Sequence, residues 1–482
     1  MSRVKNRHSQ SMSLEKIFHN IHWFEFSFTR KILILVFFIF HISLVCSVSD
    51  RGKYGNEFFG FWRPFAWDTS GWIARAGDFF AVYEAGHQAM LFRPVFRVQP
   101  ELNFLPKSQS LMRAPYTATF RYPPLIAYSF GLVLNFLEPV ASYKAWILFN
   151  ELLIVIGIYL TAKRAKNSQT AFFVIIAWLA FYPIHIEYYM GQFSLFMGFL
   201  LFFTGMNLIR GRENKSVLWW GFSIFLKVYS IPFALYWFFR RKFQLPLFFI
   251  FALVLSSLFY FSIFPSDFNL FYERGISGRL FSIEKKPPIK IKGSISAKDE
   301  SPALKKPPEL YWGSMGVQRG VLALARLFYL KQDQGGNFLT PYWAHYVLFL
   351  TMLFPLPFMV LAARDKNKNP IVILALFSLG WFFWYFDTWE HHYTLLLPLL
   401  ALLIAEEILK GYRAIIIYIL LASPSLWIIF ASPETNPLHP QNPVSYIIWE
   451  TLYYLVKPLG VIWLFFSLWR FGMRPSSITS SR

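Results

Sequence analysis

The amino-acid sequence predicts an all-α polytopic membrane protein, a bundle of about ten to twelve transmembrane helices with two large extracytoplasmic loops. Of the 482 residues, 55% are hydrophobic and only 15% are charged, whereas a soluble protein carries about a quarter charged residues. Uncharged runs that approach or exceed the roughly 18 to 20 residues of a helical span recur along the chain. These runs lie at 32–49, 188–209, 243–266, 339–363 and 414–433. No dyad-repeat pattern of a transmembrane β-barrel is present.

The net charge is +21, from 47 Lys and Arg residues against 26 Asp and Glu residues. In a soluble protein such a surplus would suggest nucleic-acid binding. Here many basic residues lie in short connections between apolar runs, which is typical of cytoplasmic loops. These connections are 163–166, 210–215, 240–242, 364–368 and 410–413. We therefore expect no nucleic-acid partner. The lone cysteine, Cys46 in the first span, excludes an intrachain disulfide.

The sequence divides into three parts. Residues 1–30 are predicted to form a basic, amphipathic cytoplasmic leader, 31–470 the transmembrane domain, and 471–482 a polar tail. The first span, about 31–49, lacks a clear cleavage site and is predicted to be a signal anchor. Basic residues precede this span, so it should leave the cytoplasm. The loop at about 50–121 is then extracytoplasmic.

The segment after this loop does not fit a straight crossing. Apolar segments at about 122–138 and 143–161 precede the basic patch at 163–166. If both crossed the bilayer, that patch would lie outside, against the usual charge bias. We expect 122–138 to be the re-entrant segment, because it is short and Pro123-Pro124 opens it. Crossing of both segments remains the alternative.

A second irregular segment, 217–239, has basic residues at both ends and contains Lys227 and Pro232. Two half-helices that meet near Pro232 would keep both ends cytoplasmic and bury Lys227 at depth. Before it, segments at about 170–186 and 191–209 are predicted to form a hairpin. Its tip, Glu187 to Gln192, should point outward because both feet are basic.

The second outer loop covers about 265–340. It contains a Lys-Pro-rich insert at 285–308, a composition that cannot build a core. An amphipathic helix is predicted at 319–330. Further spans are predicted at about 342–362, 370–386, 393–409, 414–431 and 444–469.

Two carboxylates of the first outer loop, Asp68 and Asp78, are candidate catalytic acids or bases. A loop aspartate is more often a solvated turn or cap residue. Asp78 differs because the aromatic amphipathic segment Phe79 to Tyr83 follows it, at a membrane surface where a lipid-borne substrate arrives. A carboxylate within hydrogen-bond reach can take the proton from an attacking hydroxyl.

The outer end of the span at 370–386 carries two acids and two imidazoles, Asp387, Glu390, His391 and His392. The alternative is an interfacial belt, where such residues are common. Imidazole can hydrogen-bond a phosphate oxygen or protonate it near neutral pH. Adjacent histidines on a helix point about 100° apart, which disfavours joint chelation, so we expect no metal site.

Lys227 is a cation at membrane depth, and such residues are costly and functional by default. Its expected partner is a countercharge or a phosphate, and snorkelling to an interface is the alternative. Gly191-Gln192 at the hairpin tip is ordinary turn chemistry when considered alone. No Walker loop, dinucleotide fingerprint or zinc-ligand spacing is present.

Taken in order, these motifs resemble a known family. The motifs are Asp78-Phe79-Phe80-Ala81-Val82-Tyr83-Glu84-Ala85, Phe120-Arg121-Tyr122-Pro123-Pro124-Leu125, Gly191-Gln192-Phe193-Ser194-Leu195, Arg210-Gly211-Arg212, Lys227-Val228-Tyr229-Ser230-Ile231-Pro232 and Trp389-Glu390-His391-His392. The chain resembles glycosyltransferase family 87 of the GT-C superfamily, over roughly residues 76 to 400.

The resemblance implies a GT-C-type bundle that transfers a sugar, mannose or similar, from a polyprenyl-phosphate donor. The acceptor is a lipid or glycan hydroxyl on the outer face, transfer inverts the anomeric centre, and no cofactor is expected beyond this lipid co-substrate. It implies that Asp78 is the catalytic base, and Asp68 is the alternative candidate. The implied substrate-binding residues are Tyr83, Arg121, Tyr122, Gln192, Lys227, Gln318, Glu390, His391 and His392.

The chain departs from the family pattern in places. The second outer loop has Val317-Gln318-Arg319 where the family often has Asn-Gln-Ser, and Phe193-Ser194 follows the Gly-Gln motif. These departures leave the sugar and the acceptor open. A transporter or flippase of a glycolipid or anionic solute is the alternative function. It would also use an intramembrane lysine and a broken helix, but no internal repeat is detectable. We expect the inner (plasma) membrane as the location.

Overall fold

A computed structural model describes residues 18–49, 76–96, 120–272, 315–329, 341–385, 388–424 and 443–472. Its elements are helices, and these residues contain no β-strand. The all-α class is therefore confirmed. Two of the predicted site acids, Asp68 and Asp387, lie outside the described residues, as does the Lys-Pro-rich insert.

Within the described residues, six stretches are helical, long and apolar enough to cross a membrane, which confirms a polytopic membrane protein. They belong to α2 (Phe28–Ser49), α7 (Pro139–Ala162), α8 (Ser168–Leu179) continued by α9 (Pro183–Met190), α13 (Gln244–Ile263), α17 (Pro341–Leu353) continued by α18 (Pro355–Arg364), and α23 (Pro443–Gly472). Six shorter apolar helices accompany them. Together these twelve stretches account for the predicted apolar segments.

The other helices are shorter. They are η1 (Trp23–Glu25), α4 (Gly77–Met90), α5 (Pro124–Ile126), η4 (Ala127–Gly131), α6 (Leu132–Leu134), α10 (Ser194–Ile209), α11 (Glu213–Leu226), η5 (Val228–Phe233), α12 (Ala234–Phe239), α14 (Pro265–Phe271), α16 (Val317–Tyr329), α19 (Pro370–Trp384), η7 (Glu390–Leu396), α20 (Leu397–Ala405) and α21 (Gly411–Ala422).

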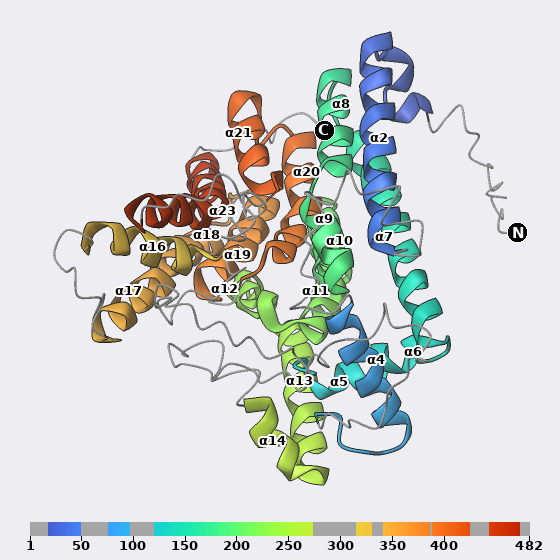
Figure 1. The fold of residues 1–482 in the computed structure, drawn as a ribbon, viewed down its shortest axis with the longest axis vertical. Helices are drawn as coiled ribbons and strands as arrows, with labels where there is room; N and C mark the ends of the chain where they lie inside the picture. The colour runs from blue at the N-terminus through green and yellow to red at the C-terminus, as the bar shows by residue number, and fades with distance from the viewer. Residues whose placement is uncertain are drawn as a thin grey trace, which may run out of the picture.

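The core lies around α10, α19 and α20. Helix α10 packs against α11, α19, α20 and η7, and every residue of α20 is buried. Helices that are apolar on all sides bury all of their faces in the interior of a bundle. By contrast, α2 and α13 leave many large apolar side chains exposed, and Figure 1 shows both at the margins of the molecule. These two surfaces suit contact with lipid.

The segment predicted to be re-entrant forms one short helix, α5–η4–α6, from Pro124 to Leu134. Eleven helical residues span about 16 Å, roughly half of the hydrocarbon thickness. The π-helical turn η4 packs tightly on α4, where Gly86 and Gly131 leave no space for a Cβ atom on either helix. The length fits a re-entrant segment that carries α4 against the bundle.

The segment 217–239 forms two half-helices as predicted, but they are interrupted at Lys227. The prediction that they meet near Pro232 was wrong. Helix α11 ends at Leu226, and Lys227 has extended backbone angles, φ −148° and ψ 131°. Pro232 lies inside the 3-10 helix η5, which continues into α12. At this interruption the lysine side chain reaches its hydrogen-bond partners, Gln192 and Ser194, on the 191–194 turn.

Candidate active site

The turn between α9 and α10 brings Gln192 beside the start of α4. Gly191 has φ +66°, a left-handed conformation that glycine adopts without strain. A Cβ atom on Gly191 would lie 2.5 Å from the Cβ of Phe79 and 3.0 Å from the Cα of Ala76. The backbone amide of Ala76 donates to the carbonyl of Tyr189 at 2.7 Å. The glycine therefore lets the turn pack directly on the first turn of α4, which carries Asp78.

Gln192 joins the predicted base to the buried cation. Its Nε2 donates to Oδ2 of Asp78 at 2.5 Å, and its Oε1 accepts from Nζ of Lys227 at 3.0 Å. The amide is thus oriented by charge on both sides, since only this orientation offers a donor to the carboxylate and an acceptor to the ammonium. Asp78 remains partly exposed, whereas Gln192 and Lys227 are buried. The carboxylate of Asp78 is therefore the most accessible of these three groups.

Lys227 is only 5% exposed, and its hydrogen-bond partners are neutral: Gln192 and the hydroxyl of Ser194 at 3.2 Å. Its Nζ lies 5.8 Å from the ring centroid of Tyr122 and 5.5 Å from that of Tyr229. An ammonium near aromatic faces gains cation–π attraction. Among the described residues no carboxylate forms a direct ion pair with this ammonium, although those of Glu187 and Asp78 lie close enough to attract it. An ammonium without a direct ion pair suits an anionic ligand.

A buried acid, Glu187, joins this region to the histidine segment. Its Oε1 accepts from the backbone amide of Leu195 at 2.9 Å, and its Oε2 accepts from the hydroxyl of Thr394 at 3.0 Å. The same hydroxyl lies 2.6 Å from the carbonyl of His391. Glu187 therefore ties α9, the first turn of α10 and η7 together. Because it is 1% exposed, its role is to hold these elements in register.

The hydrogen bonds of His392 determine its tautomer. Its Nδ1 accepts from the backbone amide of Trp389 at 2.9 Å, so the neutral ring carries its proton on Nε2. That Nε2 lies 3.5 Å from the hydroxyl of Tyr229, whose ring stacks on Trp381. The His391 ring lies 4.2 Å from that of His392. His392 thus presents an N–H donor toward Tyr229, the residue that also lies beside Lys227.

Predicted site residues that lie far apart in the sequence are therefore linked in the structure. Asp78, Gln192 and Lys227 form one hydrogen-bonded chain, and Tyr229 connects the Lys227 ammonium to His392. Tyr122 joins the same group, because its hydroxyl donates to Oε1 of Gln192 at 3.4 Å. We call Asp78, Gln192, Lys227, Tyr229 and His392 the polar chain.

Glu390 faces a different partner, a lysine that the sequence analysis missed. Its Oε1 lies 3.1 Å from Nζ of Lys457, and the two side chains are 1% and 2% exposed. Nζ of Lys457 also donates to the carbonyls of Leu421 and Ser423, both at 2.9 Å. This pair anchors η7 to α23 and to the end of α21. The signal that identified Lys227, a lysine within an apolar span, applies equally to Lys457.

Gln318 and Tyr83 donate hydrogen bonds to backbone carbonyls outside the polar chain, and Arg121 is exposed. Nε2 of Gln318 donates to the carbonyls of Phe383 and Trp384 at the end of α19. The hydroxyl of Tyr83 donates to the carbonyl of Leu137 at 2.9 Å. Burial, and then the nearby carboxylate of Glu138, raise the pKa of Tyr83 above its ordinary value. Arg121 is exposed beside Tyr122.

Chemically, the polar chain offers three functions close together. Asp78 lies in the first turn of α4, where the helix dipole favours negative charge, and it can accept a proton. Lys227 and the Nε2–H of His392 are a fixed cation and a fixed donor in a largely buried setting, where electrostatic stabilisation is strong. Among the described residues, no group of three His, Cys, Asp or Glu side chains is arranged to hold a metal ion.

Comparison with known proteins identifies a family. The sequence model of Glycosyltransferase family 87 matches residues 120–357, a stretch that contains Gln192, Lys227 and Tyr229. Asp78 and His392 lie on either side of the matched residues and are joined to them by the polar chain. No curated protein matches the chain. The match confirms the resemblance drawn from the motifs, and the protein belongs to glycosyltransferase family 87.

Proposed function

We propose that this glycosyltransferase moves a sugar, mannose or a similar hexose, from a polyprenyl-phosphate donor to a hydroxyl of a lipid or glycan. The reaction takes place on the extracytoplasmic face of the cell membrane and inverts the anomeric centre. The family match favours this function over a transporter or flippase. The observation that carries the proposal is the polar chain, which couples a partly exposed carboxylate to a buried cation.

The proposed reaction uses the two ends of the polar chain separately. Asp78 takes the proton of the acceptor hydroxyl, and the acceptor oxygen forms a bond to the anomeric carbon. The bond between that carbon and the phosphate oxygen breaks on the opposite face, and polyprenyl phosphate leaves with the electron pair. Lys227 and the Nε2–H of His392 stabilise the added negative charge of the leaving phosphate, as fixed donors do in a partly dry site.

Gln192 has a positioning role in this proposal. It keeps the carboxylate and the ammonium apart by one amide group, so that they do not neutralise each other in a direct ion pair. A direct pair would compete with both the acceptor hydroxyl and the donor phosphate. The amide therefore preserves a base and an unneutralised cation in one site.

The test is transfer of radiolabelled sugar from polyprenyl-phosphate mannose by the purified protein. We expect Asp78→Asn to fold normally and to abolish transfer, because the amide cannot accept the proton. Glu138→Gln, an exposed carboxylate variant, is the matched control and should retain activity. Near-normal turnover by Asp78→Asn would remove Asp78 from the mechanism.

A second test addresses the histidines. The double variant His391→Ala/His392→Ala should weaken use of the donor, whereas unaltered donor kinetics would mean that the pair is only structural. His392→Gln is a sharper variant, because the glutamine amide can supply an N–H near the position of Nε2. It should retain more activity than His392→Ala, and equal losses would argue against an N–H donor at this position.

A further inference from the structure

Helix α7 turns one hydrogen-bonding face toward the bundle, and the polar chain does not include it. Tyr143 and Trp146 lie on this face and are 0% and 4% exposed. On the other side of the helix Leu148, Leu152 and Val155 are more than half exposed. Residues three and four apart share one face of a helix. The polar groups of α7 therefore point into the protein, and its apolar face suits lipid.

The indole of Trp146 holds the backbone of Gln192. Its Nε1 donates to the carbonyl of Gln192 at 3.2 Å, and its ring centroid lies 5.0 Å from that of Phe193 and 5.4 Å from that of Phe130. The side-chain amide of the same glutamine donates to Asp78. Gln192 is therefore fixed at both ends, its backbone by α7 and its amide by the polar chain.

Tyr143 holds the chain just before Gln192. Its hydroxyl donates to the carbonyl of Tyr188 at 2.6 Å, and its ring centroid lies 5.5 Å from that of Phe79. Phe79 follows Asp78 in the first turn of α4. Tyr143 thus contacts both segments that meet at the Asp78 carboxylate.

A third contact joins α7 to the first span. Oε1 of Glu151 accepts from the hydroxyl of Tyr188 at 2.7 Å, and Nε2 of His41 on α2 lies 3.1 Å from both oxygens of the same carboxylate. His41 and Tyr188 are each 1% exposed. Because both partners are buried, the carboxylate has a fixed orientation. Helix α7 therefore contacts the segment 188–192 at three places, and α2 supports it from behind.

We propose that Tyr143 and Trp146 are positioning residues for sugar transfer, which hold the segment 188–192 where the Gln192 amide meets the Asp78 carboxylate. This inference rests on the proposed function for the role of Asp78. A displacement of about 1 Å can lower a rate about a hundredfold, and supporting side chains prevent such displacements. The N–H that Gln192 donates also favours the ionised carboxylate. A shifted segment should therefore weaken both the orientation and the ionisation of the base.

The first experiment removes the indole donor and keeps an aromatic ring. Trp146→Phe should lower kcat about ten- to a hundredfold. KM for the polyprenyl-phosphate donor should change little, because Lys227 and His392 are unaltered. The acid limb of the pH–rate profile, which reports ionisation of Asp78, should move to higher pH as the hydrogen bond weakens. Lys227 and Tyr122 also interact with Asp78, and both remain in this variant.

Trp178→Phe is the matched control. Nε1 of Trp178 donates to the hydroxyl of Thr161 at 3.1 Å, and its ring stacks on Phe199, so a second buried indole loses one hydrogen bond. Both variants should lower the melting temperature, but only Trp146→Phe should change kcat and the acid limb. Equal kinetic effects of the two variants, or a normal kcat in Trp146→Phe, would overturn the proposal.

Tyr143→Phe is a second variant that removes only a hydroxyl and should fold even if Trp146→Phe does not. It should move the acid limb in the same direction but by less, because its hydroxyl acts on Tyr188. Tyr418→Phe is its control, since this buried hydroxyl donates to the carbonyl of Ala177 at 3.2 Å. Identical acid limbs in the two tyrosine variants would remove Tyr143 from the proposal.

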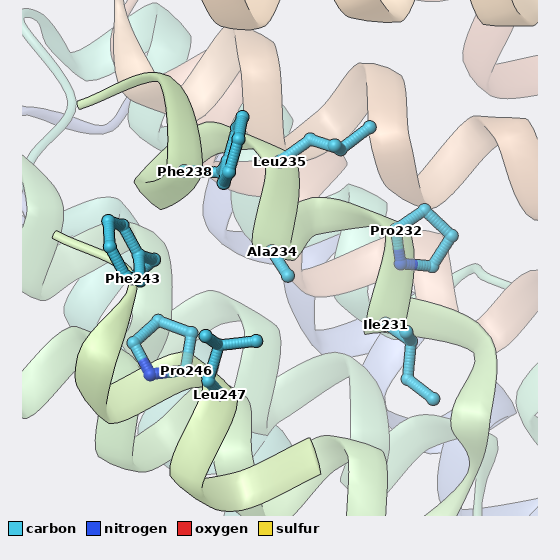
Figure 2. A pocket seen from close by; sticks show the side chains of 8 residues that line it. All are labelled: Ile231, Pro232, Ala234, Leu235, Phe238, Phe243, Pro246 and Leu247. Atoms are coloured by element: carbon cyan, nitrogen blue, oxygen red, sulfur yellow. The ribbon is translucent and has the colours of Figure 1, made fainter. Parts of the chain in front are cut away.

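A further control loosens packing elsewhere. Figure 2 shows Leu247 beside Pro246 in an apolar pocket of about 290 Å³, and no residue of α7 or of the segment 188–192 lines this pocket. Leu247→Ala should leave kcat and the acid limb unchanged. A loss as large as that of Trp146→Phe would mean that transfer responds to packing throughout the bundle, which would overturn the proposal.

The last measurement needs no transfer. Hydrogen exchange of peptides that cover 187–195 should be faster in Trp146→Phe than in the wild type or in Trp178→Phe, because the segment loses a support. Faster exchange in a protein whose wild type transfers no sugar would contradict the proposed function and leave the contact with α7 standing. If the wild type transfers sugar and Trp146→Phe matches it in exchange and turnover, the positioning role fails and the proposed function stands.

Discussion

Two buried lysines, Lys227 and Lys457, have opposite surroundings. Lys227 is hydrogen-bonded to an amide and a hydroxyl, with Asp78 one residue removed behind Gln192. Lys457 lies 3.1 Å from the Glu390 carboxylate and donates to two backbone carbonyls. Lys227 can still pair with an external anion, whereas the charge of Lys457 is already neutralised by the Glu390 carboxylate.

This difference shows that burial alone does not identify a functional cation. Both lysines are nearly inaccessible, at 5% and 2% exposure. What separates them is the charge of their partners, because an ion pair with carbonyl support is complete and has nothing left to offer a ligand. This difference supports the proposal that Lys227 binds the donor phosphate, whereas Lys457 anchors η7.

The largest expected effect tests the anchoring lysine. Lys457→Met leaves the Glu390 carboxylate buried and uncompensated, and it should reduce the free energy of unfolding by about 3–5 kcal/mol. Thermal unfolding in detergent measures this loss. The double variant Lys457→Met/Glu390→Met removes both charges and should recover most of it. A single variant as stable as the wild type would show that the pair does not anchor η7.

The next effect concerns the other lysine. Lys227→Met should lower the transfer rate about a hundred- to a thousandfold, the usual loss when one fixed electrostatic donor is removed. Its melting temperature should fall by less than that of Lys457→Met, because Lys227 attracts the buried Glu187 carboxylate only from beyond ion-pair distance. Lys166→Met removes only an exposed cation and should change neither measurement. If Lys227→Met strongly destabilised the protein but its folded fraction kept normal activity, Lys227 would be a structural anchor like Lys457.

A smaller effect tests how the turn holds Gln192 against Asp78. Gly191→Ala should destabilise the protein by about 1–3 kcal/mol, from positive φ and from contact with Phe79. Gly211→Ala is the matched control, since Gly211 has φ +65° but no neighbouring atom within 4 Å. Only Gly191→Ala should reduce transfer beyond its effect on stability. Equal behaviour of the two variants would mean that the close packing does not position Gln192.

The smallest effect is expected from Tyr83→Phe. Loss of the hydrogen bond to Leu137 should cost about 0.5–1.5 kcal/mol of stability and leave transfer nearly unchanged. Because the pKa of Tyr83 is raised by burial, its hydroxyl stays protonated below the ordinary value of about 10. The contribution of the Tyr83 hydrogen bond to stability is then lost only as the pH rises through the raised folded-state pKa. The stability difference measured between about pH 6 and 9 should be constant, and a pH-dependent difference would contradict this.

Much of the fold was predictable because long apolar runs have few alternatives in a membrane. Residue type alone also made Asp78, Lys227 and His392 candidates, since ionisable groups beside or inside apolar spans are unusual. Gln192 carried a weak signal, because a Gly-Gln pair is ordinary in a turn. Its bridging role depends on α4, more than a hundred residues earlier in the chain.

Other features depended on tertiary contacts. The break at Lys227 could not be inferred from Pro232, because the helix is interrupted where the lysine meets Gln192 and Ser194. Gln318 and Tyr83 were grouped with the site by their motifs, yet a motif does not reveal which way a side chain points. Lys457 was missed although it lies next to Pro458 within an apolar span, the same combination that drew attention to Lys227.

The interruption at Lys227 also has a consequence for biogenesis. Helix α11 has 14 residues, about 21 Å of helix, which is too short to traverse a hydrocarbon layer of about 30 Å. We therefore expect the two half-helices to enter the bilayer together, after the 191–194 turn has been integrated and can receive the ammonium. Accessibility mapping of nascent chains truncated after 226 and after 242 would test this order, and stable integration of the shorter chain would contradict it. The lysine that we propose for the donor phosphate would then also depend on the 191–194 turn during synthesis.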